Sequence, residues 1–185
     1  MAKTKEQLLN ILDQFQLDEK VVSAEPFGNG HINDTLKVTN EKGEIKYVLQ
    51  RINHLIFTNV DMLQNNIHVV TTHIRKKLEE KGETDIDRKV LTFLPTKDGK
   101  KYYFDGDSYW RVCLFIPRSK SYEEVTPELS YEAGKAFGDF QTMLSDIPEG
   151  TLGETIPDFH NMEFRLKQLR DAVATNAAGR VAEVQ

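Results

Sequence analysis

Hydrophobic residues near the start of the chain recur every three or four positions and then switch to every second position. The first pattern covers residues 4–15, where Thr4 and Gln7 have the spacing of a capping box, and it predicts a short amphipathic helix. The second pattern predicts three strands, over residues 21–27, 35–39 and 44–52. Because only short turns rich in glycine and asparagine separate these strands, we expect consecutive antiparallel hairpins.

A long helix follows the three strands. Apolar residues repeat at steps of three and four across residues 60–78, with Thr58 as the expected N-cap and Gly82 at the end. Period-two runs then resume over residues 88–94, 101–104 and 108–116. The first 116 residues therefore predict an antiparallel sheet of about five strands with one inserted helix.

The chain changes class at Pro117, which stops the last predicted strand. The later periodicity is helical, with one helix after Thr126 that has Pro127 in its first turn, and another over residues 161–173. A β region followed only by helices is typical of a two-lobed α+β protein with a cleft between its lobes. We expect one lobe over residues 1–116, and a hinge and helical part over residues 117–185.

Composition and charge narrow the class of protein. The 185 residues include 24 Lys and Arg against 29 Asp and Glu, a net charge of −5, which argues against a dedicated nucleic-acid binder. The single cysteine, Cys113, cannot form an internal disulfide, and the polar start has no signal-peptide core. No apolar run is long enough to span a bilayer. We therefore expect a cytoplasmic protein that binds neither nucleic acid nor membranes.

The turn between the first two predicted strands carries the first candidate chemistry, in the run Gly28-Asn29-Gly30-His31-Ile32-Asn33-Asp34-Thr35. A P-loop is excluded because it needs glycine and lysine at positions 33 and 34, and a Rossmann turn would open a helix instead of a strand. A strand, a glycine turn and two further strands are the layout in which a hairpin covers ATP phosphates, because backbone N–H groups approach oxygens where no Cβ intervenes. An ordinary hairpin without a ligand is the alternative.

The third predicted strand, Tyr47-Val48-Leu49-Gln50-Arg51-Ile52, stands where such a hairpin needs a positive or donor side chain for the phosphates. Strand alternation puts Gln50 and Arg51 on opposite faces, and either of them fills this role. The inserted helix should offer a carboxylate partner, but its only acidic residue before Glu79 is Asp61 in the first turn. The usual lysine–glutamate ion pair is therefore altered or absent.

Four segments together resemble the aminoglycoside phosphotransferase-like kinase superfamily, and within it the N-acetylhexosamine 1-kinases. They are residues 28–35, the run Val48-Leu49-Gln50-Arg51-Ile52-Asn53, the run Gly134-x-x-x-Gly138-x-Phe140-Gln141, and residues 156–160 with Arg165. The resemblance covers essentially the whole chain. It implies a protein-kinase-like N-lobe followed by the first helices of a helical C-lobe.

The implied activity is transfer of the γ-phosphoryl group of ATP, with Mg²⁺, to a hydroxyl of a small-molecule sugar. Kinases of another acceptor, such as an aminoglycoside, choline or homoserine, are an alternative, as is a non-catalytic kinase-like binding module. The resemblance assigns nucleotide contacts to Gly28, Asn29, Gly30, His31, Asn33, Thr35, Val48, Gln50, Arg51, Phe115 and Ile116. It assigns sugar contacts to His31, Phe159 and His160. The last two strand residues, Phe115 and Ile116, would bind adenine through their backbone, and Phe159 has packing onto the next helix as its alternative role.

The catalytic loop of this family, H-x-D-x-x-x-x-N, does not occur in the sequence, because none of the five histidines has aspartate two residues later. We therefore expect no catalytic residue in this chain and Mg²⁺ ligands that lie outside it. The final residues 180–185 contain no helix stop, which is typical of an interrupted chain. We expect residues 1–185 to be a truncated portion without transfer activity, and the sequence leaves the oligomeric state open.

Overall fold

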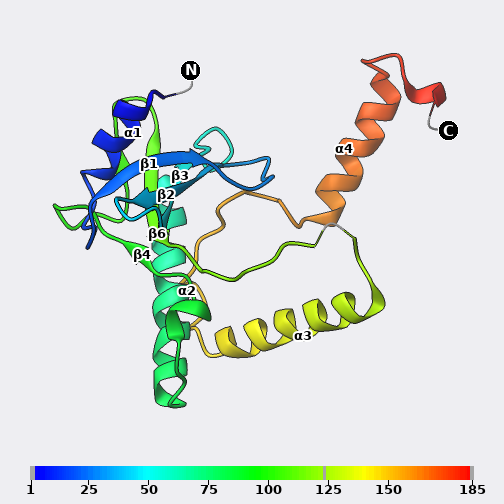
Figure 1. The fold of residues 1–185 in the computed structure, drawn as a ribbon. Helices are drawn as coiled ribbons and strands as arrows, with labels where there is room; N and C mark the ends of the chain where they lie inside the picture. Colours follow the sequence, from blue (N-terminus) through cyan, green and yellow to red (C-terminus); the bar gives the residue numbers. More distant parts are fainter. Residues whose placement is uncertain (1–2, 123, 184–185) are drawn as a thin grey trace. The chain divides into compact units, whose positions relative to one another are not determined.

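The computed structural model describes residues 3–122 and 124–183 and has an α+β fold (Figure 1). The strands are β1 (Val21–Pro26), β2 (Asp34–Asn40), β3 (Ile45–Ile52), β4 (Phe93–Leu94), β5 (Tyr103–Phe104) and β6 (Tyr109–Leu114). The helices are α1 (Lys5–Leu12), α2 (Val60–Glu80), α3 (Pro127–Leu144) and α4 (Met162–Thr175), with 3-10 turns η1 (Ile86–Arg88) and η2 (Val181–Glu183). The chain divides into two compact units, one ending at Gly153 and one beginning at Glu154.

The six strands form one antiparallel sheet in the order β1-β2-β3-β6-β4, with β5 paired to β6. Its register places Gln50 of β3 opposite Thr35 of β2 and opposite Arg111 of β6. The predicted antiparallel sheet with one inserted helix is confirmed, with six strands where about five were expected. Because β6 lies in the middle, the chain leaves the sheet from beside β3.

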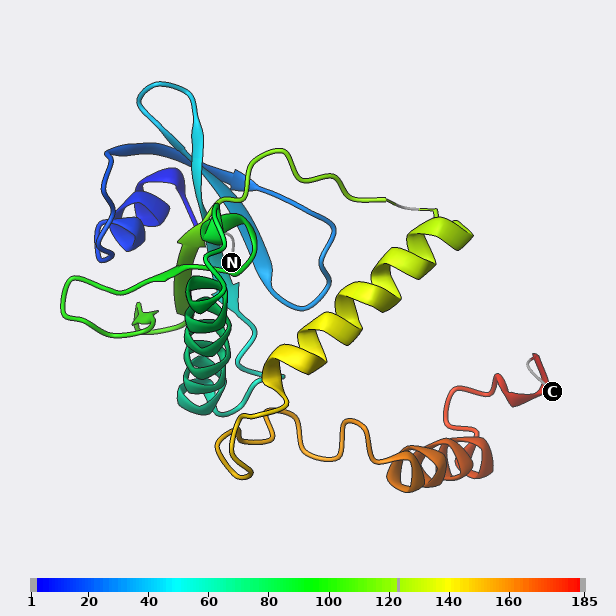
Figure 2. The same ribbon diagram turned by 90° about the horizontal axis from the view of Figure 1, so that it is seen from below.

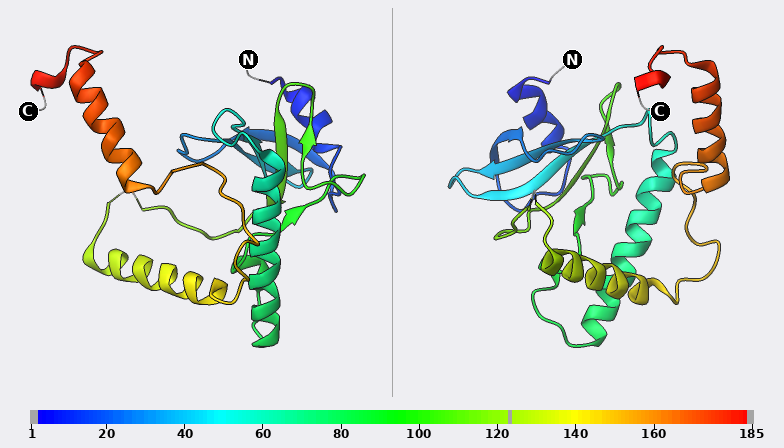
Figure 3. Two further views of the ribbon diagram at one scale, coloured as in Figure 1. Left: turned by 180° about the vertical axis from the view of Figure 1, so that it is seen from behind. Right: turned by 90° about the vertical axis from the view of Figure 1, so that its right-hand side faces the viewer.

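One face of the sheet is covered by α1, which lies on the opposite side from α2 (Figures 1 and 3). The predicted capping box begins α1: Thr4 Oγ1 accepts from the Gln7 N–H at 3.3 Å, and Gln7 Oε1 accepts from the Thr4 N–H at 2.8 Å. The main hydrophobic core lies between α1 and this face. It comprises Leu8, Ile11, Leu12, Phe15, Val38, Tyr47, Leu49, Trp110 and Val112.

The predicted long helix, α2, begins one residue later than expected. Asn59, and not Thr58, is its N-cap, because the Asn59 side chain accepts from the Met62 N–H at 2.9 Å. Towards its C-terminal end α2 packs Ile74 and Leu78 against Val90 in a second, smaller core. The end of α3 comes beside this part of α2 (Figures 1 and 2).

The strand predicted over residues 88–94 is wrong for most of its length, because only Phe93 and Leu94 pair with β6. Residues 86–88 form η1 instead. The Asp87 carboxylate accepts from the Thr92 hydroxyl at 2.7 Å and from Arg75 of α2 at 2.6 Å, and these bonds hold the segment in a turn. The strand expected over 101–104 is likewise reduced to Tyr103–Phe104.

The two helices after the sheet begin as predicted. Thr126 caps α3 by accepting from the Leu129 N–H at 3.3 Å, and Asn161 caps α4 by accepting from the Phe164 N–H at 3.1 Å. Across residues 3–122 and 124–183, no helix is both long and apolar enough to cross a membrane. The lobe boundary expected at residue 116 stays a prediction, and Val184 and Gln185, from the segment expected to lack a helix stop, lie outside the described residues.

Candidate functional site

The glycine turn between β1 and β2 is open on its outer side. Gly28 has φ +80°, a conformation that favours glycine, and a Cβ added at Gly28 or Gly30 would have no atom within 4 Å. Asn29 and His31 are exposed, as expected for the tip of a turn. The backbone of residues 28–31 is therefore accessible to a ligand.

Two hydrogen bonds fix the ends of this turn. The Phe27 N–H donates to the Thr35 carbonyl at 2.8 Å, which continues the ladder between β1 and β2. The Asn53 N–H donates to the Asn33 side-chain oxygen at 3.0 Å, which ties the returning end of the turn to the end of β3. Residues 28–32 are the part between these two anchors.

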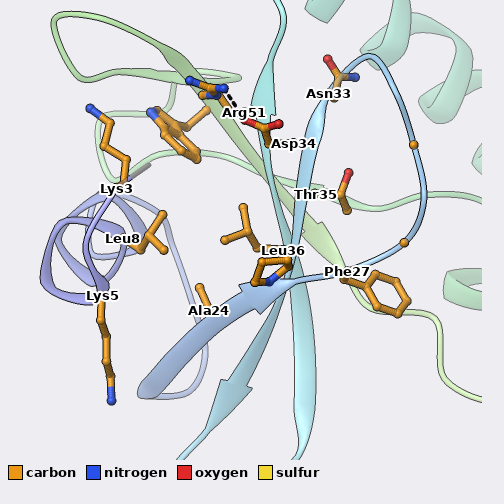
Figure 4. A pocket seen from close by; sticks show the side chains of 14 residues that line it. Lys3, Lys5, Leu8, Ala24, Phe27, Asn33, Asp34, Thr35, Leu36 and Arg51 are labelled. Carbon is orange, nitrogen blue, oxygen red and sulfur yellow. Dashed lines mark ion pairs between the residues drawn. The ribbon is translucent and has the colours of Figure 1, made fainter. Parts of the chain in front are cut away.

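The structure places Gln50 and Arg51 on opposite faces of the sheet. Arg51 faces α1 and forms an ion pair with Asp34 (Figure 4). Gln50 lies on the α2 face, where its Nε2 donates to Thr35 Oγ1 at 3.1 Å and its Oε1 accepts from Arg111 Nε at 3.0 Å. The two candidates for the phosphate contact therefore belong to two different surfaces.

The surface that contains Arg51 is a cavity of about 740 Å³ between α1 and the glycine turn (Figure 4). Three cations line it, but Arg51 is paired with Asp34, and Lys3 is paired with Asp105 at 2.8 Å. Burial acts to raise the pKa of Asp105, but hydrogen bonds from Lys3, the Ser108 and Asp107 amides and Trp110 outweigh it and lower the pKa to about 2. Two of the three positive charges are thus already neutralised, which makes this cavity a weak candidate for a polyphosphate.

On the α2 face, Arg111 has few partners for a charged side chain. Its Cζ lies 5.2 Å from the centroid of the Phe93 ring, and Gln50 accepts from its Nε. Its Nη1 is buried and has no hydrogen-bond partner in the part of the chain that the structure describes. Burial lowers the pKa of the Arg111 guanidinium, because desolvation disfavours the charged form.

Sequence reasoning missed Arg111. The signal for it was a charged residue in the middle of the apolar strand Tyr109–Leu114, at a position where alternation points away from the core residues Trp110 and Val112. Its neighbour two residues on, Cys113, is buried as expected of a core residue. Burial raises the pKa of the Cys113 thiol to about 11, so it is not a nucleophile at neutral pH.

The segment after β6 meets the base of the glycine turn. The rings of Phe27 and Phe115 pack edge to face with their centroids 5.9 Å apart, and in Figure 4 Phe27 points away from α1. The Phe115 N–H donates to the Lys46 carbonyl at 2.9 Å, and the Ser119 hydroxyl donates to the Ile116 carbonyl at 3.2 Å. The Phe115 N–H is therefore occupied within the sheet, and the expectation that the backbone of Phe115 and Ile116 binds adenine stays a prediction that rests on the Phe115 carbonyl and the Ile116 N–H.

Val48 lies on the α2 face with Gln50, opposite Cys113 in the register of β3 and β6. Thr35, Val48, Gln50 and Arg111 thus share a face with the Phe27–Phe115 pair. This face, with the glycine turn at its edge, is the candidate site.

Phe159 and His160 belong to the second compact unit. Their rings pack edge to face at 4.8 Å, and Arg165 of α4 lies with its Cζ 5.6 Å from the centroid of the Phe159 ring. Arg165 Nε also donates to the Phe159 carbonyl at 3.3 Å. Phe159 therefore contacts Arg165 of α4 while remaining 52% exposed, and its assignment to a sugar stays a prediction.

The described residues do not fit a metal ion. Within residues 3–122 and 124–183, no three His, Cys, Asp or Glu side chains are grouped so that they could hold one. No protein-family model matches the chain. Function therefore has to be inferred from the site itself.

Proposed function

We propose that this chain is the nucleotide-binding portion of an ATP-dependent small-molecule kinase, similar to the N-lobe of the N-acetylhexosamine 1-kinases. One observation carries the proposal: the Phe27–Phe115 pair and the hydrogen-bonded row Thr35–Gln50–Arg111 share one face of the sheet. The glycine turn lies at the edge of this face and also lines the cavity on the α1 side. Together they offer an apolar contact for a base and donors for phosphates, which are the two chemistries that a nucleotide needs.

In this arrangement Phe27, Val48 and Phe115 contact the adenine ring. The backbone N–H groups of residues 28–31 bind phosphate oxygens, because the exposed glycines let an anion approach the main chain. The acceptor is a sugar hydroxyl, with His31 of the glycine turn as its candidate contact. In a kinase of this kind Mg²⁺ would neutralise phosphate charge when bound, and no group of three metal-binding side chains occurs among the described residues.

A non-catalytic nucleotide-binding module is the second candidate. It is favoured by the absence of an H-x-D-x-x-x-x-N sequence and by the lack of a metal-binding group among the described side chains. Both candidates predict nucleotide binding by residues 1–185 without phosphoryl transfer.

Isothermal titration calorimetry of residues 1–185 with adenosine, ADP, ATP and inorganic tripolyphosphate tests the proposal. We expect adenosine to bind, and ADP and ATP to bind more tightly. The variant F115A should weaken the binding of adenosine and of ADP by about tenfold, because the contact between the Phe115 ring and the base contributes on the order of 1 kcal/mol. The variant F104A is the matched control, since Phe104 is an exposed aromatic of β5 that pairs with Tyr109.

Binding of tripolyphosphate as tight as that of ATP, with no measurable binding of adenosine, would show a general anion site and contradict the proposal. The same would follow if none of the four ligands bound at millimolar concentration. Release of ADP from ATP by this chain in the presence of N-acetylhexosamines would contradict the expectation of binding without transfer.

A further inference from the structure

The strongest unexplained feature of the molecule is the side chain of Arg111. A buried cation is costly unless a carboxylate or another anion compensates it. Within residues 3–122 and 124–183, no carboxylate forms an ion pair with Arg111. Its contacts are the neutral amide of Gln50 and the face of the Phe93 ring.

Gln50 is oriented toward Arg111 and not toward a ligand. Its amide oxygen accepts from Arg111 Nε, and its amide nitrogen donates to the Thr35 hydroxyl. Both ends of the amide are therefore occupied within the sheet. These contacts hold the guanidinium in place and supply no negative charge, so Gln50 is a positioning residue.

A second unsatisfied donor lies on α2. Gln64 is 3% exposed, and its Nε2 has no hydrogen-bond partner among the described residues. Gln64 and Phe93 line the same cavity of about 440 Å³, and Arg111 stacks on that same Phe93. Arg111 Nη1 and Gln64 Nε2 are both unpaired hydrogen-bond donors among the described residues, so each of them needs an acceptor. An anion is an acceptor that also compensates the positive charge of Arg111.

We propose that Arg111 binds the phosphates of the nucleotide and supplies the positive charge that the third strand lacks, while Gln50 orients it. This inference rests on the proposed function. Arg111 as a whole residue is only partly buried, although its Nη1 is buried. A planar guanidinium makes two parallel hydrogen bonds to phosphate, which an amide at position 50 cannot provide.

The experiment compares ADP with adenosine in wild-type residues 1–185 and in R111M, R111K and R170Q, by calorimetric titration and thermal unfolding. Removing a phosphate contact should weaken ADP about tenfold to a hundredfold in R111M and leave adenosine unchanged. R111K should weaken ADP binding less than R111M does, because lysine keeps the positive charge but lacks the planar guanidinium that makes two parallel hydrogen bonds. R170Q is the matched control: it removes a guanidinium from an exposed position of α4, and ADP affinity should stay within about twofold.

Thermal unfolding separates a ligand-binding role from a structural one. Replacing an uncompensated buried charge by an apolar side chain of similar length often stabilises a protein, so R111M should have an unchanged or raised Tm. If Arg111 had only a structural role, its substitution would instead lower the Tm and leave the ratio of ADP affinity to adenosine affinity unchanged. Failure of R111M to fold, or an unchanged ratio, overturns the inference while the nucleotide proposal stands. Wild-type protein that binds neither ligand overturns both.

Discussion

Asp105 shows how one partly buried carboxylate can hold several parts of the molecule together. It follows β5, and it accepts from Lys3, from the Ser108 N–H at 2.8 Å and from Trp110 Nε1 at 2.9 Å. Burial opposes the charge, but these donors keep the pKa of Asp105 at about 2. The carboxylate therefore joins the start of α1, the β5–β6 turn and the indole at the edge of the core.

This lowered pKa gives a pH-dependent contribution to stability. The folded pKa of about 2 lies below the value of roughly 3.9 for an unfolded chain, so the contribution is present above pH 4 and is lost as the pH falls toward 2. We expect D105N to lower the free energy of unfolding by about 1–2 kcal/mol at pH 7 and to flatten its decline between pH 5 and pH 2.

Urea unfolding at a series of pH values measures both effects. Asp107 in the same turn is exposed, so D107N serves as the control and should retain the acid sensitivity of the wild-type chain. Equal pH profiles for D105N and the wild type would show that Asp105 does not carry this dependence.

At the scale of elements, the capping box of α1 matters because the helix delivers Leu8, Ile11 and Leu12 to the main core. We expect T4A to lower the free energy of unfolding by about 1 kcal/mol, since it leaves the Gln7 N–H without its cap. Urea denaturation followed by Trp110 fluorescence measures this. S130A in α3 is the control, because it also replaces a hydroxyl side chain by alanine but at an exposed position that does not cap the helix. It should change the free energy of unfolding by less than about 0.5 kcal/mol.

Local patterns in the sequence were sufficient to predict most elements, because caps and periodicity are local. Thr4 and Thr126 cap the helices that their positions predicted. The segment before β4 was mistaken for a strand because its turn depends on Arg75, which approaches Asp87 only in the folded state. The insertion of β6 between β3 and β4 is a pairing of distant segments, which no local pattern contains.

For the candidate site too, local patterns predicted one part, and the remainder depends on how distant segments pack. Alternation correctly placed Gln50 and Arg51 on opposite faces, but which of these faces α1 covers depends on how the helix docks. Arg111 is a candidate for binding phosphate because the strand register places it beside Gln50. Its buried Nη1 also has no hydrogen-bond partner among the described residues. Its role is a property of packing that composition does not encode.

At the scale of the whole molecule, the two compact units differ in how much they bury. In the first, the central strands contribute the fully buried residues Val38, Leu49 and Val112. In the second, the apolar residues of α4 remain open to solvent, with Leu169 61% and Val173 45% exposed. A helix of 14 residues that buries little is marginal by itself.

Hydrogen exchange should therefore separate the units. We expect the amides of α4 to exchange at least about a thousandfold faster than those of β3 and β6, because only the latter open through unfolding of the core. Mass spectrometry of peptides from residues 45–52, 109–114 and 162–175 in one sample gives the comparison. Protection of α4 equal to that of the central strands would show that its apolar side chains are covered in solution.

Under the proposed function, the hydrogen bond between the Asn53 N–H and the Asn33 side chain limits how much of the chain would lose freedom if the glycine turn bound phosphates. With both ends anchored, only residues 28–32 have to be ordered, and two of these are glycines, which lose the most conformational freedom. Without this anchor the free stretch would extend to Asn33, the residue before β2, and the entropy cost of closing a loop grows with its length. By fixing one end of the turn, Asn33 lowers the conformational entropy that residues 28–32 would lose on binding a ligand.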